Sequence, residues 1–171
     1  NLACSYRDTG QHAEALVLHE ETLKLRRAKL GPDHPDTLHS MYNLAEGYRA
    51  TGQHAMALAL HEKTLELRRA KLGPDHPDTL RTQASFALSL AQAGRHDEAI
   101  TMCRSAVKGL RAGLGPDHPS TRQYAGDLRR LEESAAGQGK GAMLCILVFA
   151  FLLIYYFFNR SILLWRLFSH F

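Results

Sequence analysis

The sequence is poor in cysteine, and the three cysteines that it has form no recognisable group. Cys4, Cys103 and Cys145 are widely spaced among the 171 residues, and no CxxC pair occurs. An odd and sparse set of this kind argues against a disulfide scaffold and is typical of a reducing compartment. Cys4 and Cys103 also fall at positions that we expect to be packed within helices, which does not favour a reactive thiol.

The main part of the chain also lacks an excess of positive charge. The first 140 residues contain 19 Lys and Arg against 17 Asp and Glu, although the whole chain carries a formal net charge of +4. No basic block with interleaved aromatic residues appears, and that pattern is the usual sign of a nucleic-acid-binding surface. We therefore predict that the protein does not bind nucleic acid.

Motifs of catalysis and metal binding are absent as well. The sequence has no GxSxG, no phosphate-binding loop with its Lys and Ser or Thr, no HExxH and no Cys/His quartet. The sequence His34-Pro35-Asp36 offers metal-ligand types, but its copies recur once per repeat, which favours helix capping over zinc binding. The sequence predicts a protein that is not an enzyme and that holds no cofactor and no metal.

What the sequence does contain is a long internal repeat. The stretch LGPDHPDTL at residues 30–38 returns unchanged at residues 72–80 and returns as LGPDHPST at residues 114–121, each time 42 residues further on. Residues 10–38 and 52–80 are identical at 25 of 29 positions. A repeat of this length is typical of stacked-repeat proteins, in which each unit buries its apolar face against its neighbours.

Each repeat is predicted to form two antiparallel helices joined by a tight turn. Gly31 and Pro32 end one helix, Asp33 or His34 can cap the next helix, and Pro35 suits its first turn. The fold class is therefore all-α, an α-solenoid with full units near 34–71 and 76–112. The chain starts at Asn1, within a repeat, and we interpret it as a fragment. The expected helices span 1–9, 11–29, 34–51, 53–71, 76–93, 95–112 and a more polar capping helix at 118–134, before a Gly-rich linker at 135–141.

Several residues give this repeat a family resemblance. Asn43-Leu44-Ala45, Tyr48, Gly52 and Ala57 fall where the tetratricopeptide pattern has its Leu-Gly/Ala, its aromatic residue, its turn glycine and its packing alanine. The 42-residue period and the GPDHPDT joint resemble the kinesin light chain variety of this repeat. The resemblance covers about residues 1–134. It implies a TPR superhelix that binds a protein or peptide partner, a cargo or an adaptor, and it implies kinesin heavy chain as a further partner.

The sequence departs from the family pattern at some positions. His19 and His61 replace the usual aromatic residue of the second helix, as does Cys103 in the third unit, and Ser85 stands where Asn43 stands one unit earlier. The heptad region by which light chains join heavy chains is not in this sequence. Similar 42-residue repeats also occur in signalling proteins, often behind a nucleotide-binding domain. A repeat region that regulates a larger signalling protein is therefore an alternative function.

The expected binding surface is the concave face, which the first helix of each pair lines in stacked helix pairs. The resemblance implies that Asn43 and Asn1 hydrogen-bond the backbone of an extended peptide, and that Arg81 meets an acidic or carboxylate group, which a guanidinium suits by geometry. The alternative is that these are only solvated polar residues of exposed helices. Steps of three and four place one set of residues on this face. The set is Asn1, His39, Asn43, Glu46, Ala50, Arg81, Ser85, Leu88, Gln92, Gln123, Asp127 and Arg130.

The last part of the chain is a different kind of sequence. Residues 142–158 (AMLCILVFAFLLIYYFF) carry no charge, and as a helix these 17 residues span about 26 Å, slightly less than the hydrocarbon layer of a membrane. The excess of Lys and Arg before this run places the repeats in the cytoplasm, and residues 159–171 form an apolar juxtamembrane tail. The sequence thus predicts a tail-anchored protein with a transmembrane helix. A buried helix that caps the repeats and a gene-model artefact are the alternatives.

Overall fold

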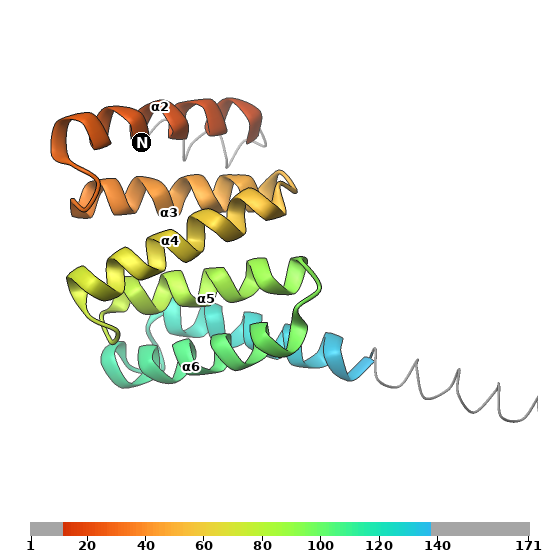
Figure 1. Ribbon diagram of the computed structural model, residues 1–171. Coiled ribbons are helices and arrows are strands. Elements are labelled where there is room, and N and C mark those ends of the chain that lie inside the picture. Colours follow the sequence, from red (N-terminus) through yellow and green to blue (C-terminus); the bar gives the residue numbers. More distant parts are fainter. Residues whose placement is uncertain (1–11, 138–171) are drawn as a thin grey trace, which may run out of the picture. The chain divides into compact units, whose positions relative to one another are not determined.

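The computed structural model describes residues 12–137 of the chain, and this part of the protein consists of helices joined by short turns (Figure 1). Successive helices pack against one another, so the described part forms an α-solenoid of helix pairs, as predicted. The helices are α2 (His12–Leu30), α3 (Pro35–Ala50), α4 (His54–Leu72), α5 (Pro77–Gln92) and α6 (His96–Leu114), followed by a helix over residues 119–137.

The chain divides into two compact units by its internal contacts. The first unit extends from Asn1 to Leu131 and the second from Glu132 to Phe171. The predicted linker at 135–141 was wrong in its first three residues, which continue the helix over 119–137. Ala135 and Ala136 are the reason, because alanine is the strongest helix former.

The repeated GPDHP motif is a joint that ends one helix and starts the next. Gly31 has a φ of +90°, a left-handed value that glycine adopts without strain, and its amide donates to a carbonyl of the last turn of α2 (3.1 Å). His34 caps α3, since its Nδ1 accepts a hydrogen bond from the amide of Asp36 (3.2 Å). His76 and His118 accept equivalent bonds at the next two joints. Of the two caps that the sequence allowed, the histidine is the one used.

The predicted apolar faces form the core between the helices. Leu38, Met41, Leu44 and Ala45 of α3 are all buried, as the three-four spacing predicts. A second cluster joins α5, α6 and the helix over 119–137. Removal of these side chains from water holds the successive helices together. The buried residues of the second cluster are Leu80, Ala84, Ala87, Cys103, Ala106, Val107, Leu110 and Tyr124.

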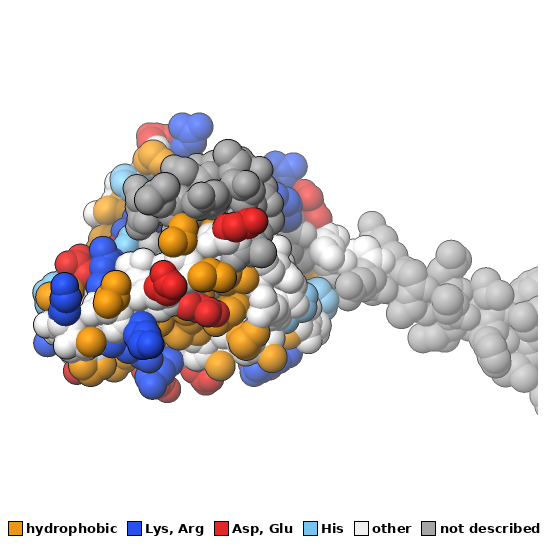
Figure 2. Space-filling model, turned by 90° about the horizontal axis from the view of Figure 1, so that it is seen from above, with side chains coloured by type: hydrophobic (Ala, Val, Ile, Leu, Met, Phe, Trp, Pro, Cys, Tyr) orange, Lys and Arg blue, Asp and Glu red, His pale blue; other side chains and the backbone are white. Residues whose placement is uncertain are grey.

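The surface of the described helices mixes charges of both signs with apolar side chains. On the face seen in Figure 2, basic and acidic side chains are interspersed, and no large patch of one sign stands out. The large apolar residues that remain exposed among the described residues are Val17, Leu25, Leu30 and Met56. Scattered apolar side chains are normal on protein surfaces, so this face does not by itself indicate a binding site.

Several predictions fall outside the described residues. They are the first helix with Asn1, the remainder of the linker at 138–141, the transmembrane helix at 142–158 and the tail at 159–171. Within residues 12–137, no helix is long and apolar enough to cross a membrane. Over the same residues, no group of three or more His, Cys, Asp or Glu side chains is placed to hold a metal ion.

Candidate peptide-binding groove

The predicted inward-facing residues lie on α3, α5 and the helix over 119–137, and they differ in accessibility. His39 and Gln123 are exposed, and the Arg81 side chain keeps 43% of its accessible surface. These three positions are equivalent in successive repeats, each 42 residues from the last. Asn43 is half-buried, and its amide has no hydrogen-bond partner among the described residues. All four side chains therefore keep surface with which to contact a partner, whereas Asn1 lies outside the described residues.

A hollow opens on this face between α3, α5 and the helix over 119–137. Its volume is about 320 Å³, and all of its lining belongs to the first unit. Four lining residues are members of the predicted inward set, and the other three are their neighbours. Leucine and alanine give the hollow an apolar part, and two arginines and an aspartate give it a charged part. The lining residues are Arg49, Leu88, Ala91, Gln92, Asp127, Arg130 and Leu131.

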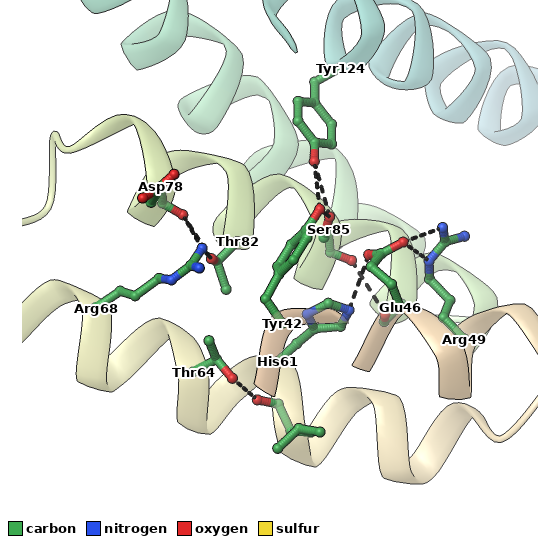
Figure 3. Close-up of polar contacts among 12 residues, drawn as sticks. Tyr42, Glu46, Arg49, His61, Thr64, Arg68, Asp78, Thr82, Ser85 and Tyr124 are labelled. Carbon is green, nitrogen blue, oxygen red and sulfur yellow. Dashed lines mark hydrogen bonds and ion pairs between the residues drawn. The ribbon is translucent and has the colours of Figure 1, made fainter. Parts of the chain in front are cut away.

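Glu46, another predicted inward residue, is engaged with its own protein. Its Oε2 lies 2.7 Å from Nη2 of Arg49, and its Oε1 lies 3.4 Å from Nε2 of the fully buried His61 (Figure 3). Burial alone would raise the pKa of Glu46, but the His61 imidazole and the Arg49 guanidinium lower it to about 2. The carboxylate is therefore ionised at neutral pH and is committed to α3 and α4.

Ser85 is also turned inward rather than open to a partner. Only 2% of its surface is accessible, and its hydroxyl lies 3.1 Å from that of Tyr42 and 3.2 Å from that of Tyr124. Asn43, one repeat earlier, is half-buried at the equivalent position. The same repeat position thus points to a possible ligand contact in one unit and to a contact between helices in the next.

The end of this face where α3 and α5 begin is electropositive. Arg81 pairs with Asp78, three residues earlier, and the contact lowers the pKa of the Asp78 carboxyl, which burial alone would raise. Burial, followed by the positive charges of Arg68 and Arg26, lowers the pKa of His39. His39 is therefore uncharged at neutral pH, and the arginines supply the positive charge around it.

Three side chains near this face were not singled out by the sequence prediction: Tyr42, Arg68 and Tyr124. Nη1 of Arg68 donates to the carbonyl oxygen of Asp78 (2.9 Å) and to Oγ1 of Thr82 (2.7 Å). The Arg68 guanidinium also lies 5.3 Å from the centre of the Tyr42 ring, within the range of a cation–π contact. The available signal was a departure from the repeat, since the positions 42 residues from these side chains hold different residue types.

The chain matches the tetratricopeptide repeat family over residues 1–70 and again over residues 42–112. Among solved structures it is similar to a Podospora anserina protein described as a kinesin light chain with nearly identical TPR-like repeats. The TM-score is 0.72 at 29% sequence identity, and the match covers 79% of this chain and 64% of that one. The chain therefore spans somewhat less than two thirds of the length of that structure.

Two further structures extend the comparison. A single-substitution variant of the Podospora anserina protein matches with a TM-score of 0.65 and 28% identity, over 87% of this chain and 70% of that one. BtubC (BKLC) from P. vanneervenii has a TM-score of 0.66 at 19% identity, over 78% and 53% of the two chains, which is a likeness of fold. A search of curated proteins found no match.

Proposed function

Because the chain belongs to the tetratricopeptide repeat family, we propose that its first unit is a non-catalytic protein-interaction module. It binds an extended peptide segment of a partner protein along α3, α5 and residues 119–131. The observation that carries the proposal is the hollow of about 320 Å³ on the predicted inward face, lined by Leu88, Gln92, Asp127 and Arg130 of the predicted set. A concave surface with a few polar groups around apolar side chains is the usual form of a binding site.

The accessible polar groups of this face suit an extended backbone. The Asn43 amide has both donors and an acceptor, so it can pair with the N–H and the C=O of a peptide. Because Asn43 has no hydrogen-bond partner among the described residues, it can form these bonds without first breaking others. Arg81 is paired on one side with Asp78 but remains 43% exposed, which leaves guanidinium N–H groups for a carboxylate of the partner.

The likeness to proteins described as kinesin light chains supports a cargo or adaptor protein as the partner. Contact with kinesin heavy chain is a further part of this proposal. It is tested by mixing the chain with a purified heavy-chain tail and measuring whether the two co-elute in size-exclusion chromatography. Separate elution at concentrations of tens of micromolar, by order of magnitude, would remove heavy chain from the proposal.

The groove assignment is tested with a peptide selected from a random dodecapeptide library displayed on phage. The double substitution Asn43→Ala, Arg81→Ala should weaken binding of the synthetic peptide about tenfold or more in calorimetry, since it removes a backbone contact and a charge-assisted bond. Thermal unfolding should change little, because both side chains reach the surface. Lys108→Ala, which removes an exposed cation from α6, is the matched control and should leave the affinity unchanged. Equal affinity of the double variant and the wild type would refute the assignment.

The uncharged run at residues 142–158 favours a second candidate function, that of a membrane-tethered adaptor. The full chain should then partition into lipid vesicles in a flotation assay, and residues 1–140 should stay in the aqueous fraction. If both stay in the aqueous fraction, the tether is excluded. The peptide-binding proposal does not depend on this outcome, because its residues all lie before residue 132.

A further inference from the structure

Three hydroxyl groups from three successive inward helices meet inside the first unit. They belong to Tyr42 of α3, Ser85 of α5 and Tyr124 of the helix over 119–137 (Figure 3). The hydroxyl oxygens of Tyr42 and Ser85 are 3.1 Å apart, those of Tyr42 and Tyr124 are 3.2 Å apart, and those of Ser85 and Tyr124 are 3.2 Å apart. We refer to these three side chains as the hydroxyl cluster. Each hydroxyl can donate to one neighbour and accept from the other, so all three can be satisfied together.

The surroundings of the hydroxyl cluster keep it in place. Ser85 and Tyr124 are almost completely buried. The Tyr42 ring has the Arg68 guanidinium 5.3 Å from its centre, and the His61 ring meets it edge-on at 6.0 Å. Burial raises the pKa of the Tyr124 hydroxyl, which therefore stays protonated and can donate. Buried hydrogen bonds of this kind are costly to break, because the freed groups find no water.

The repeats themselves show that the hydroxyl cluster is not part of the common template. The positions equivalent to Tyr42 in the next two units hold Ala84 and Gly126, which have no side chain that could reach a neighbouring helix. The position one repeat before Tyr124 holds Thr82, whose short side chain is bonded within its own joint. The cluster therefore depends on two tyrosines, each of which occurs once at its repeat position.

The hydroxyl cluster lies directly beside the candidate groove. Tyr42 precedes Asn43 in α3, and Ser85 belongs to the inward set of α5. One helical turn beyond Ser85 and Tyr124 lie Leu88 and Asp127, which line the hollow. A change in the separation of the three helices at the cluster therefore changes the separation of the groups that line the groove.

We propose that Tyr42, Ser85 and Tyr124 are positioning residues that hold α3, α5 and residues 119–131 at a fixed spacing and thereby set the affinity of the groove for peptide. The inference rests on the proposed function, and it adds which side chains give the groove its width. None of the three hydroxyls has to touch the peptide. Their effect passes through the positions of the helices.

The first test measures the spacing without any peptide. Nitroxide labels are attached to p-acetylphenylalanine at His39 and Gln123, two exposed positions on α3 and the helix over 119–137, and the distance distribution is measured by double electron–electron resonance. Tyr42→Phe and Tyr124→Phe each remove one hydroxyl and keep the ring, and each should shift or broaden the distribution. Ser85→Ala removes the third hydroxyl with a minimal change of volume and should have the same effect.

Tyr48→Phe is the matched control for the loss of a tyrosine hydroxyl. Tyr48 also lies in α3, but its hydroxyl donates to Glu20 of α2 (2.7 Å), on the other side of the helix pair from α5. Its loss should leave the label distance unchanged. A general loosening of the protein would affect the control and the test variants alike, whereas loss of the hydroxyl cluster affects only the test variants.

The second test measures affinity for the library-selected peptide. Each hydroxyl-cluster variant should bind about five-fold more weakly, and the double variant Tyr42→Phe, Tyr124→Phe should lose less than the product of the single losses, because the two share one network. Unchanged label distances or unchanged affinity in Tyr42→Phe and Tyr124→Phe would overturn the proposal. If no library peptide binds the wild type through Asn43, the proposed function fails, and the label distances alone then decide whether the cluster sets the spacing.

Discussion

The second and third helix pairs have the same backbone template but bury different chemistry. α3 and α4 correspond to α5 and α6 with an offset of 42 residues. In the second pair the interior holds a carboxylate, an imidazole and a guanidinium, and in the third pair it holds apolar side chains and a thiol. The pairs of equivalent residues are Glu46 and Leu88, His61 and Cys103, and Arg68 and Leu110.

The difference shows that one helical framework can be held together in two ways. Arg68 makes directed bonds to the start of α5, at the carbonyl of Asp78 and the hydroxyl of Thr82. Leu110, at the same place in the next unit, is fully buried and stabilises only by filling space. The second pair should therefore be sensitive to charge and pH, and the third pair to side-chain volume.

Leu110→Ala should be the most destabilising single change, because it leaves a cavity in a fully buried position. We expect a loss of about 3–4 kcal/mol in the free energy of unfolding, measured by urea titration. Leu25→Ala is the matched control, since Leu25 is 60% exposed, and it should cost well under about 1 kcal/mol. Losses of similar size for the two leucines would contradict the view that the third pair depends on volume.

Arg68→Ala should come next, with a loss of about 2–3 kcal/mol. It removes two hydrogen bonds and the contact with the Tyr42 ring, and it leaves the Thr82 hydroxyl with fewer partners. Arg26→Ala is the control at the equivalent position of α2, where the arginine bonds Ser40 and a carbonyl in the same way but is less buried. The Arg26 variant should lose less; an equal or larger loss would show that burial does not decide the cost.

Acid should weaken the second pair through Glu46. Its pKa in the folded protein is about 2, below the ordinary value of 4.5, so its contribution is complete above pH 4.5 and is lost as the pH falls through 2. The contribution is at most about 3 kcal/mol, from 2.5 pKa units. The variant Glu46→Leu, His61→Cys imports the pair of the third unit, and its unfolding free energy should fall less between pH 5 and pH 2.5 than that of the wild type. Parallel pH profiles would refute the assignment.

Loss of a histidine cap should have the smallest of these effects. His76→Ala removes the acceptor for the amide of Asp78 at the start of α5 (3.1 Å) and should cost about 1 kcal/mol in urea titration. Asp75→Ala removes the neighbouring residue that the sequence alone could not exclude as a cap. Asp75 accepts no capping bond, since the cap of α5 is His76, so its loss should be close to zero. A larger loss for Asp75 would show that the cap is wrongly assigned.

The helices and most of the core could be predicted from the sequence, and the candidate site only in part. The spacing of Leu38, Met41 and Leu44 was enough to place them in the core, because one helical face must be apolar in a stack. Glu46 and Ser85 were predicted to face a partner by the same spacing. The spacing defines a face of one helix, but it does not say whether a histidine or a tyrosine from another helix lies against that face.

The sequence by itself determined the unit length, the joints and the family of the fold. These follow from local chemistry: glycine for the left-handed turn, histidine for the cap and proline for the first turn at every 42nd residue. Only the tertiary structure decided which polar residues stay accessible, because that depends on contacts between units. Tyr42 and Tyr124 are 82 residues apart in the chain, and their hydroxyls meet only because α3, α5 and the helix over 119–137 stack side by side.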